Sequence, residues 1–343
     1  MWIAFEKAVE CVLTLLLMGS VGYILARRNI IGPETRKALP QFVVNIALPP
    51  FLFYNIVTGF THDKLIQLFY GCLIPVLSIF LTYGIAWVCA IVFPPPSMRR
   101  GAFQVSFGFS NTMFIGLPVS ITLFGAQSIP YVLLYYFGNT FFFWTAGNYI
   151  ISRDSPIHKA RIFSFHTIRQ MMTPPLFALL LGVPLVFYEV RLPGFIANTV
   201  KYLGEMTTAL ALIFVGVTLS QVKFRELMKP DRDVILGLIG RHLLSPVLVV
   251  ATLFILRALT PFIAFPPDVA DMFIHPPLLM MQVFAIQAGL PLGTMVAVMT
   301  AYYRTDKEYA SVMVSLSTLL GMISIPLTIL VVSHPAFARL VGS

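Results

Sequence analysis

The sequence predicts an all-α polytopic membrane protein, with ten transmembrane helices in two inverted five-helix repeats. Three observations support this prediction. Hydrophobic residues make up 58% of the 343 residues and charged residues only 11%, whereas a soluble domain carries about 25% charged residues. The mean hydropathy is +0.86. Ten apolar segments have the length of a membrane span, and two of them carry matching interruptions. Most of the protein surface must therefore face lipid.

A helix needs about 20 mainly apolar residues to cross the hydrocarbon core of a bilayer. The ten segments that qualify are residues 8–26, 38–58, 65–93, 101–123, 129–151, 168–188, 196–220, 233–259, 273–300 and 308–332. The first segment has no basic leader and no clear cleavage site, so we interpret it as a retained span and not as a signal peptide.

The basic residues predict the orientation, because Lys and Arg concentrate in cytoplasmic loops. With both termini outside the cell, 16 of the 23 basic residues fall in inside loops and five fall outside. The inside residues are Arg27, Arg28, Arg36, Lys37, Arg99, Arg100, Arg153, Lys159, Arg161, Arg169, Lys223, Arg225, Lys229, Arg232, Arg304 and Lys307. The outside residues are Lys7, Lys64, Arg191, Lys201 and Arg339. This bias explains the net charge of +9 without a nucleic-acid partner.

Motifs for other functions are missing from the sequence. Cys11, Cys72 and Cys89 lie in apolar runs without C-x-x-C spacing, so neither a metal site nor a disulfide framework is predicted. No metalloprotease, serine-hydrolase or nucleotide-binding motif is present. We therefore expect neither an enzyme nor a bound cofactor.

The fourth and ninth segments share a distinctive interruption. Residues 108–118 read GFSNTMFIGLP, and residues 287–294 read QAGLPLGT. Gly, Pro and small polar residues thus occupy corresponding mid-membrane positions in two halves that enter from opposite sides. Paired interruptions of this kind are the best sequence pointer to a transporter binding site.

An interrupted helix exposes free N–H groups where its second half begins, and these groups attract anions. Candidate substrate-binding residues at the two breaks are Asn111, Thr112, Gln287, Pro291 and Thr294. Alternatively, the polar side chains cap the breaks or hydrogen-bond between helices.

The eighth segment adds a buried charge. Arg241 inside a span is a candidate ligand for a carboxylate, or else a clamp on carbonyl groups freed by a broken helix. His242 is a candidate proton-coupling residue, or else a packed histidine.

Asn139 in the fifth segment and Asn45 beside Pro49 are further site candidates. Few acidic residues lie in the spans, so a carboxylate sodium site is not evident, although carbonyl and hydroxyl oxygens could bind sodium.

The sequence at these positions resembles the auxin efflux carrier family. Ser110-Asn111-Thr112, residues 115–118, residues 287–291 and residues 307–309 carry the resemblance, together with residues 47–50 and 241–246. The likeness covers essentially the whole chain, and the short loop after the fifth segment is typical of the bacterial malate and malonate permease-like branch. Ser110 departs from the plant carriers, which have proline at this place.

The resemblance implies a fold similar to bile-acid symporters and sodium/proton antiporters, with crossing broken helices four and nine. It implies repeats at residues 1–158 and 159–343, scaffold helices 1, 2, 6 and 7, and transport helices 3–5 and 8–10. It also implies a homodimer in the plasma membrane.

The leading functional hypothesis is an elevator-type secondary transporter of small organic anions. The substrates would be dicarboxylates such as malate or malonate, or auxin-like carboxylates, with possible proton or sodium coupling. An anion channel, a sodium-coupled organic-acid symporter and a receptor are the alternatives.

Overall fold

The computed structural model describes residues 2–61, 69–157, 169, 172–190, 192–221, 230–263 and 265–342. Within these ranges the chain is helical and forms no β-strand, apart from one isolated antiparallel bridge between Ser110 and Leu292. The expected repeat boundary at residues 158 and 159 lies outside the described residues. So do seven of the basic loop residues, namely Lys64, Lys159, Arg161, Arg191, Lys223, Arg225 and Lys229.

Helices occupy most of the described residues of each expected segment, with non-helical interruptions in the segments at 101–123, 168–188 and 273–300. In the first half the elements are α1 (Trp2–Arg27), α2 (Pro33–Phe42), η1 (Val43–Ala47), α3 (Leu48–Gly59), α5 (Leu73–Val92), η2 (Ser97–Arg99), α6 (Arg100–Gly108), η3 (Thr112–Gly116), α7 (Leu117–Phe124), η4 (Ala126–Ser128), α8 (Ile129–Phe142), η5 (Phe143–Gly147) and α9 (Asn148–Arg153).

In the second half they are α11 (Pro174–Phe187), α12 (Gly194–Ser220), α14 (Arg232–Ile239), η6 (Gly240–Leu244), α15 (Ser245–Leu259), α16 (Pro267–Ile274), α17 (Leu278–Gly289), α18 (Met295–Tyr302), α19 (Lys307–Ser333) and α20 (Pro335–Val341).

Five helical runs in the described chain are long and apolar enough to cross a membrane, by length and composition. They are Pro33–Gly59, Phe69–Val92, Gly194–Ser220, Arg232–Leu259 and Lys307–Ser333. A sixth candidate is the pair α16 and α17, which bends by 65° at its break. The protein is therefore a multi-pass membrane protein, and the ten-span topology stays a prediction.

Proline explains three of the four π-helical turns in the described chain. η1, η3 and η6 each end two residues before a proline, at Pro49, Pro118 and Pro246. Proline has no N–H group and its ring collides with the carbonyl four residues back. In each case the residue before the proline donates instead to the carbonyl five residues back, which widens the turn.

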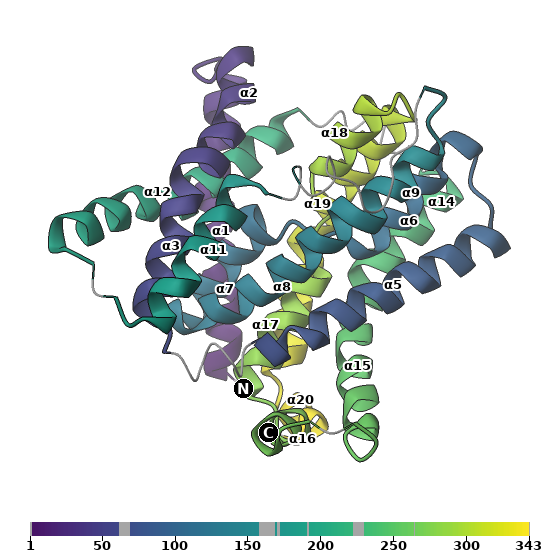
Figure 1. The fold of residues 1–343 in the computed structure, drawn as a ribbon. Coiled ribbons are helices and arrows are strands. Elements are labelled where there is room, and N and C mark those ends of the chain that lie inside the picture. The colour runs from purple at the N-terminus through teal and green to yellow at the C-terminus, as the bar shows by residue number, and fades with distance from the viewer. Residues whose placement is uncertain are drawn as a thin grey trace.

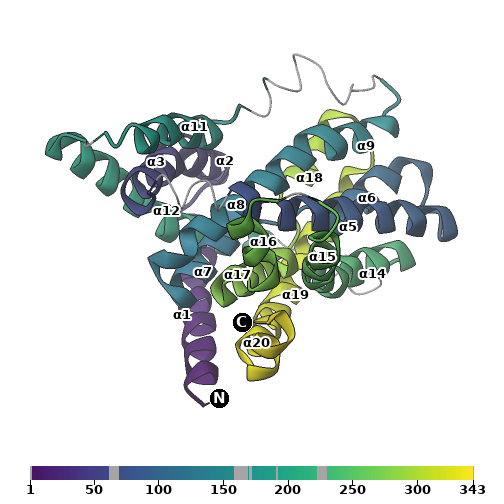
Figure 2. The ribbon, with the colours of Figure 1, turned by 60° about the horizontal axis from the view of Figure 1, so that its bottom comes forward.

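The helices form two neighbouring groups. Helices α1, α3, α11 and α12 pack against one another on one side of the molecule, and α5, α6, α9, α14, α15, α18 and α19 lie on the other (Figures 1 and 2). The largest apolar core lies mainly in the second group and extends into α16 and α17, with buried side chains that include Phe103, Phe273 and Phe284. Between the groups run α7, α8 and α17, which carry or adjoin the interrupted segments (Figure 1).

Candidate functional site

The first break separates α6 from η3. The helix ends at Gly108, the backbone becomes extended at Phe109, and η3 begins at Thr112 after Asn111. The side chain of Asn139 in α8 hydrogen-bonds to the backbone of this break. Its Oδ1 accepts from the Ser110 N–H at 3.1 Å, and its Nδ2 donates to the Ser110 carbonyl at 2.9 Å. The Asn139 carboxamide thus pairs with the backbone N–H and C=O of buried Ser110, as a peptide group of a neighbouring strand would.

The second break lies directly against the first. Helix α17 ends at Gly289, and α18 begins at Met295. The Asn111 N–H donates to the Pro291 carbonyl at 2.9 Å, and the Gly293 N–H donates to the Phe109 carbonyl at 3.3 Å. These bonds join the two interruptions as a short antiparallel bridge. Backbone groups that would be unsatisfied in hydrocarbon are thereby paired with each other.

Arg241 and His242 hold the carboxyl-terminal end of α17. The Arg241 Nη2 donates to the carbonyl of Ala288, and the His242 Nδ1 lies 3.1 Å from the carbonyl of Gly289. Both side chains are buried. The last carbonyls of a helix carry partial negative charge, so a cation there is favourable. In this structure Arg241 therefore has the geometry of a clamp on freed carbonyl groups.

His242 also connects the two sides of the second break. Its Nε2 lies 3.0 Å from the Ser317 hydroxyl, which accepts from the Leu292 N–H at 2.8 Å. Because the Gly289 carbonyl can only accept, we assign the proton to Nδ1, which leaves Nε2 to accept from Ser317. The imidazole of His242 therefore completes a hydrogen-bonded chain from Leu292 through Ser317 to Gly289. The proton-coupling role of His242 stays a prediction.

The helical segments that begin after the breaks carry no acidic side chain of their own. The sequence has no Asp or Glu between residues 64 and 153, or between residues 272 and 305. Thr112 and Thr294 stand where η3 and α18 begin, so two positive helix ends have no carboxylate on their own segments. The side chain of Asn111 is 9% exposed and makes no hydrogen bond among the described residues.

The Gln287 side chain in α17 packs against Gly116, at the end of η3. Its Nε2 donates to the Ser120 hydroxyl at 3.1 Å, while its buried Oε1 has no hydrogen-bond partner among the described residues. A Cβ atom on Gly116 would collide with the Gln287 carboxamide and with Leu290. Glycine is therefore required for α17 to approach this closely.

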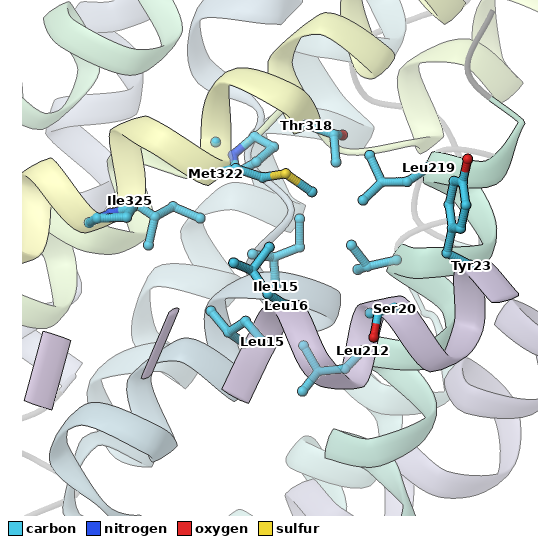
Figure 3. Close-up of a pocket in the computed structure, with 15 residues that line it drawn as sticks. Leu15, Leu16, Ser20, Tyr23, Ile115, Leu212, Leu219, Thr318, Met322 and Ile325 are labelled. Carbon is cyan, nitrogen blue, oxygen red and sulfur yellow. The ribbon is translucent and has the colours of Figure 1, made fainter. Parts of the chain in front are cut away.

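A cavity of about 220 Å³ adjoins the crossing. Helices α1, α12 and α19 form most of its wall, and Ile115 and Pro291 bring the two interrupted segments into it (Figure 3). The wall is mainly apolar, with hydroxyl groups from Ser20, Tyr23 and Thr318 and no charged side chain. The cavity thus lies where the two helix groups meet, beside the breaks.

The structure brings together most of the residues that the sequence selected. Asn111, Thr112, Asn139, Arg241, His242, Gln287, Pro291 and Thr294 lie in or beside the two breaks. Asn45 does not join them, because it is exposed in η1. Sequence reasoning missed Ser120 and Ser317. Small polar residues within apolar helices were the available signal for both.

This architecture defines a class of protein. It is a multi-pass membrane protein with two interrupted helices meeting at a buried polar centre, which is a feature of secondary transporters. Residues 7–329 match the family described as Membrane transport protein. The chain belongs to this family, the auxin efflux carrier family, and is a membrane transporter.

Several curated proteins are similar over much of the chain. An "Uncharacterized transporter" of Methanothermobacter thermautotrophicus is 28% identical over 329 residues, covering 94% of this chain and 98% of that protein. A "Putative malonate transporter" of Rhizobium meliloti is 21% identical over 308 residues, 89% of each chain. The "Lysosomal cholesterol signaling protein" of Mus musculus is 26% identical over 237 residues, covering 65% of this chain and 27% of that protein.

Proposed function

We propose that the protein is a secondary transporter of small organic anions. It binds a substrate carboxylate at the amino-terminal ends of the helical segments that follow the two breaks. One observation carries the proposal. The carboxyl-terminal end of α17 already has cationic Arg241 beside it, whereas the segments that begin at Thr112 and Thr294 contain no acidic residue. A carboxylate from outside would supply the missing negative charge.

The cavity supports a route to this position. It lies between α1 and α12 on one side and α19 with the interrupted segments on the other. In the proposed elevator mechanism, helices α1, α3, α11 and α12 remain fixed as a scaffold. The remaining helices, three spans from each of two inverted five-span repeats, carry the breaks across the membrane. Sliding at the cavity wall would then expose the bound anion to either side.

The substrate class follows from chemistry and similarity together. Dicarboxylates such as malonate or malate are our first candidates, supported by the similarity to the malonate transporter named above. Auxin-like carboxylates are the second, supported by the apolar cavity wall. We further propose a homodimer in the plasma membrane with both termini outside, coupled to protons or to sodium.

Uptake by purified protein in proteoliposomes tests this proposal. Labelled malonate, malate and indole-3-acetate should be offered with and without a proton gradient or sodium. We expect uptake of at least one acid. We expect Asn111→Ala to reduce it, because the variant removes an unpaired amide at the helix start, while Asn198→Ala, at an exposed position in α12, should transport normally.

Two results would contradict the proposal. One is wild-type uptake by Asn111→Ala, which would place the substrate elsewhere. The other is an anion current far above about 10³ charges per second, because alternating access is limited by motions on μs–ms timescales. That second result would indicate a channel.

A further inference from the structure

Arg241 is a fully buried cation without an acidic partner among the described residues. Its Nη2 donates a hydrogen bond to the Ala288 carbonyl at the end of α17. A helix end provides only about half a negative charge. A buried charge is costly unless it is paired and hydrogen-bonded. The contact with α17 therefore leaves part of the positive charge uncompensated.

Several buried hydrogen-bonding groups around Arg241 also have no partner. They include Nε and Nη1 of Arg241 itself and the hydroxyl groups of Tyr83 and Ser110, none of which bonds to another described group. The ring of Tyr83 packs against Gly108, and Gly240, the neighbour of Arg241, packs against Phe107, the neighbour of Gly108. The hydroxyl of Tyr135 lies beside both Arg241 and Ser110. These groups therefore gather at one place, behind the first break.

The chemistry of this cluster selects its occupant. Every one of these groups can donate a hydrogen bond, and the cluster has a positive charge and no carboxylate from a described residue. A cation is therefore excluded. A water molecule could hydrogen-bond to these groups, because hydroxyl oxygens also accept, but it would leave the charge of Arg241 unbalanced. An anion accepts from all the donors and also neutralises the charge.

We propose that Arg241, Tyr83 and Ser110 bind a resident monovalent inorganic anion of about halide size. Such an anion would complete the hydrogen bonding of Arg241 while its Nη2 continues to hold α17. The site is distinct from the proposed substrate position, because Arg241 holds the end of α17, whereas the substrate would bind where η3 and α18 begin. The inference does not depend on the transported substrate.

Thermal unfolding of the purified protein tests the proposal, with chloride as the probe. Chloride should replace gluconate at constant ionic strength, because gluconate is too large for an enclosed halide site. We expect the unfolding temperature to rise with chloride and to saturate, since a ligand that binds the native state stabilises it. Bromide should act in the same way, and its anomalous scattering should place it beside Arg241.

Matched variants connect the effect to this cluster. Tyr83→Phe and Ser110→Ala each remove one hydroxyl group and no charge, so each should raise the chloride midpoint by about fivefold or more. Arg241→Gln should abolish the chloride response. Arg257→Gln is the control, because Arg257 donates to the carbonyls of Phe273 and Ile274 outside this cluster, and its response to chloride should persist.

The contradicting results are specific. Equal unfolding temperatures in chloride and gluconate would overturn the proposal, as would an unchanged chloride midpoint in the Tyr83→Phe, Ser110→Ala double variant. Water alone beside Arg241 in a bromide-soaked structure would do the same. Loss of the chloride response in saturating malonate would show that the cluster is the substrate site. Absence of organic-acid uptake with an intact chloride response would refute the proposed function alone.

Discussion

At the scale of single residues, buried polar side chains mainly complete the broken backbone. Asn139 supplies both hydrogen bonds to Ser110, and Ser317 accepts from the Leu292 N–H. These side chains come from the helices that follow the two interrupted segments, α8 and α19. The centre of the molecule is therefore polar because the backbone is interrupted there, and its side-chain roles follow from that.

Ser317→Ala tests this interpretation at one atom. The substitution leaves the Leu292 N–H without an acceptor, and an unsatisfied buried donor costs about 1–3 kcal/mol. We expect a lower apparent unfolding temperature and slower transport. Ser324→Ala is the matched control. The Ser324 hydroxyl lies 2.9 Å from the His242 Nδ1, and this nitrogen retains its contact with the Gly289 carbonyl when the hydroxyl is removed. Equal effects of the two variants would show that the bond to Leu292 is unimportant.

Asp154 makes a pH-dependent contribution at the loop after α9. Burial raises the pKa of this carboxyl, although the Gly101 N–H at 2.6 Å and two nearby arginines act in the opposite direction. A raised folded-state pKa gives stability that is complete below the unfolded pKa of about 3.9 and is lost as pH rises through the folded value.

Asp154→Asn should therefore raise the unfolding temperature at pH 7, because the amide oxygen can still accept from Gly101 without a buried charge. The difference from wild type should disappear near pH 4, as measured by thermal unfolding across pH. A lower unfolding temperature for Asp154→Asn at pH 7 would mean that attraction to Arg100 and Arg153 outweighs burial.

At the scale of helices, glycine sets the closest approaches. A Cβ on Gly22 in α1 would collide with the backbone of Ile213 in α12, and a Cβ on Gly216 would collide with the backbone of Gly19. The two helices thus pack backbone to backbone, as small residues permit in membrane proteins. Because the cavity lies between this pair and α19, their separation sets its width.

Gly216→Ala should force α1 and α12 apart, since backbone atoms cannot move aside as a flexible side chain can. Overpacking of this kind typically costs about 1–3 kcal/mol, so we expect a lower unfolding temperature in detergent. Gly84→Ala is the matched control, because a Cβ on Gly84 meets no atom within 4 Å. Equal stability of the two variants would contradict the close packing.

At the scale of the whole molecule, hydropathy predicted the helical segments well, because a membrane helix requires a long apolar run. The segments at 196–220 and 308–332 end within a few residues of α12 (Gly194–Ser220) and α19 (Lys307–Ser333). Gly and Pro likewise indicated both breaks. The corner between α16 and α17 was missed although His275-Pro276-Pro277 marks it, because the predicted segment 273–300 included these residues in the span.

The site was predictable only in part, for a physical reason. The sequence selects Asn139 and Arg241 as polar residues in spans, but it does not show which group each one binds. In the structure both bind backbone, because the three-dimensional crossing exposes carbonyl and N–H groups exactly where these side chains reach. Contacts between distant segments, such as that between Ser317 and Leu292, depend on this crossing and leave no local pattern.

The central claim is that the two helix starts lack an anion, which the substrate supplies. Asn111→Asp tests it most directly, because it places a carboxylate at that position. Asp is as good as Asn at a helix start, and a negative charge there is favourable. Asn29→Asp makes the same change in the loop after α1 and serves as the control.

The decisive measurement is uptake of labelled malonate, or of whichever acid the wild-type protein transports, into proteoliposomes containing Asn111→Asp. We predict an unfolding temperature equal to or above that of the wild type and uptake reduced by about tenfold or more, because like charges at one site repel. Uptake at the wild-type rate by a stably folded Asn111→Asp variant would contradict the account.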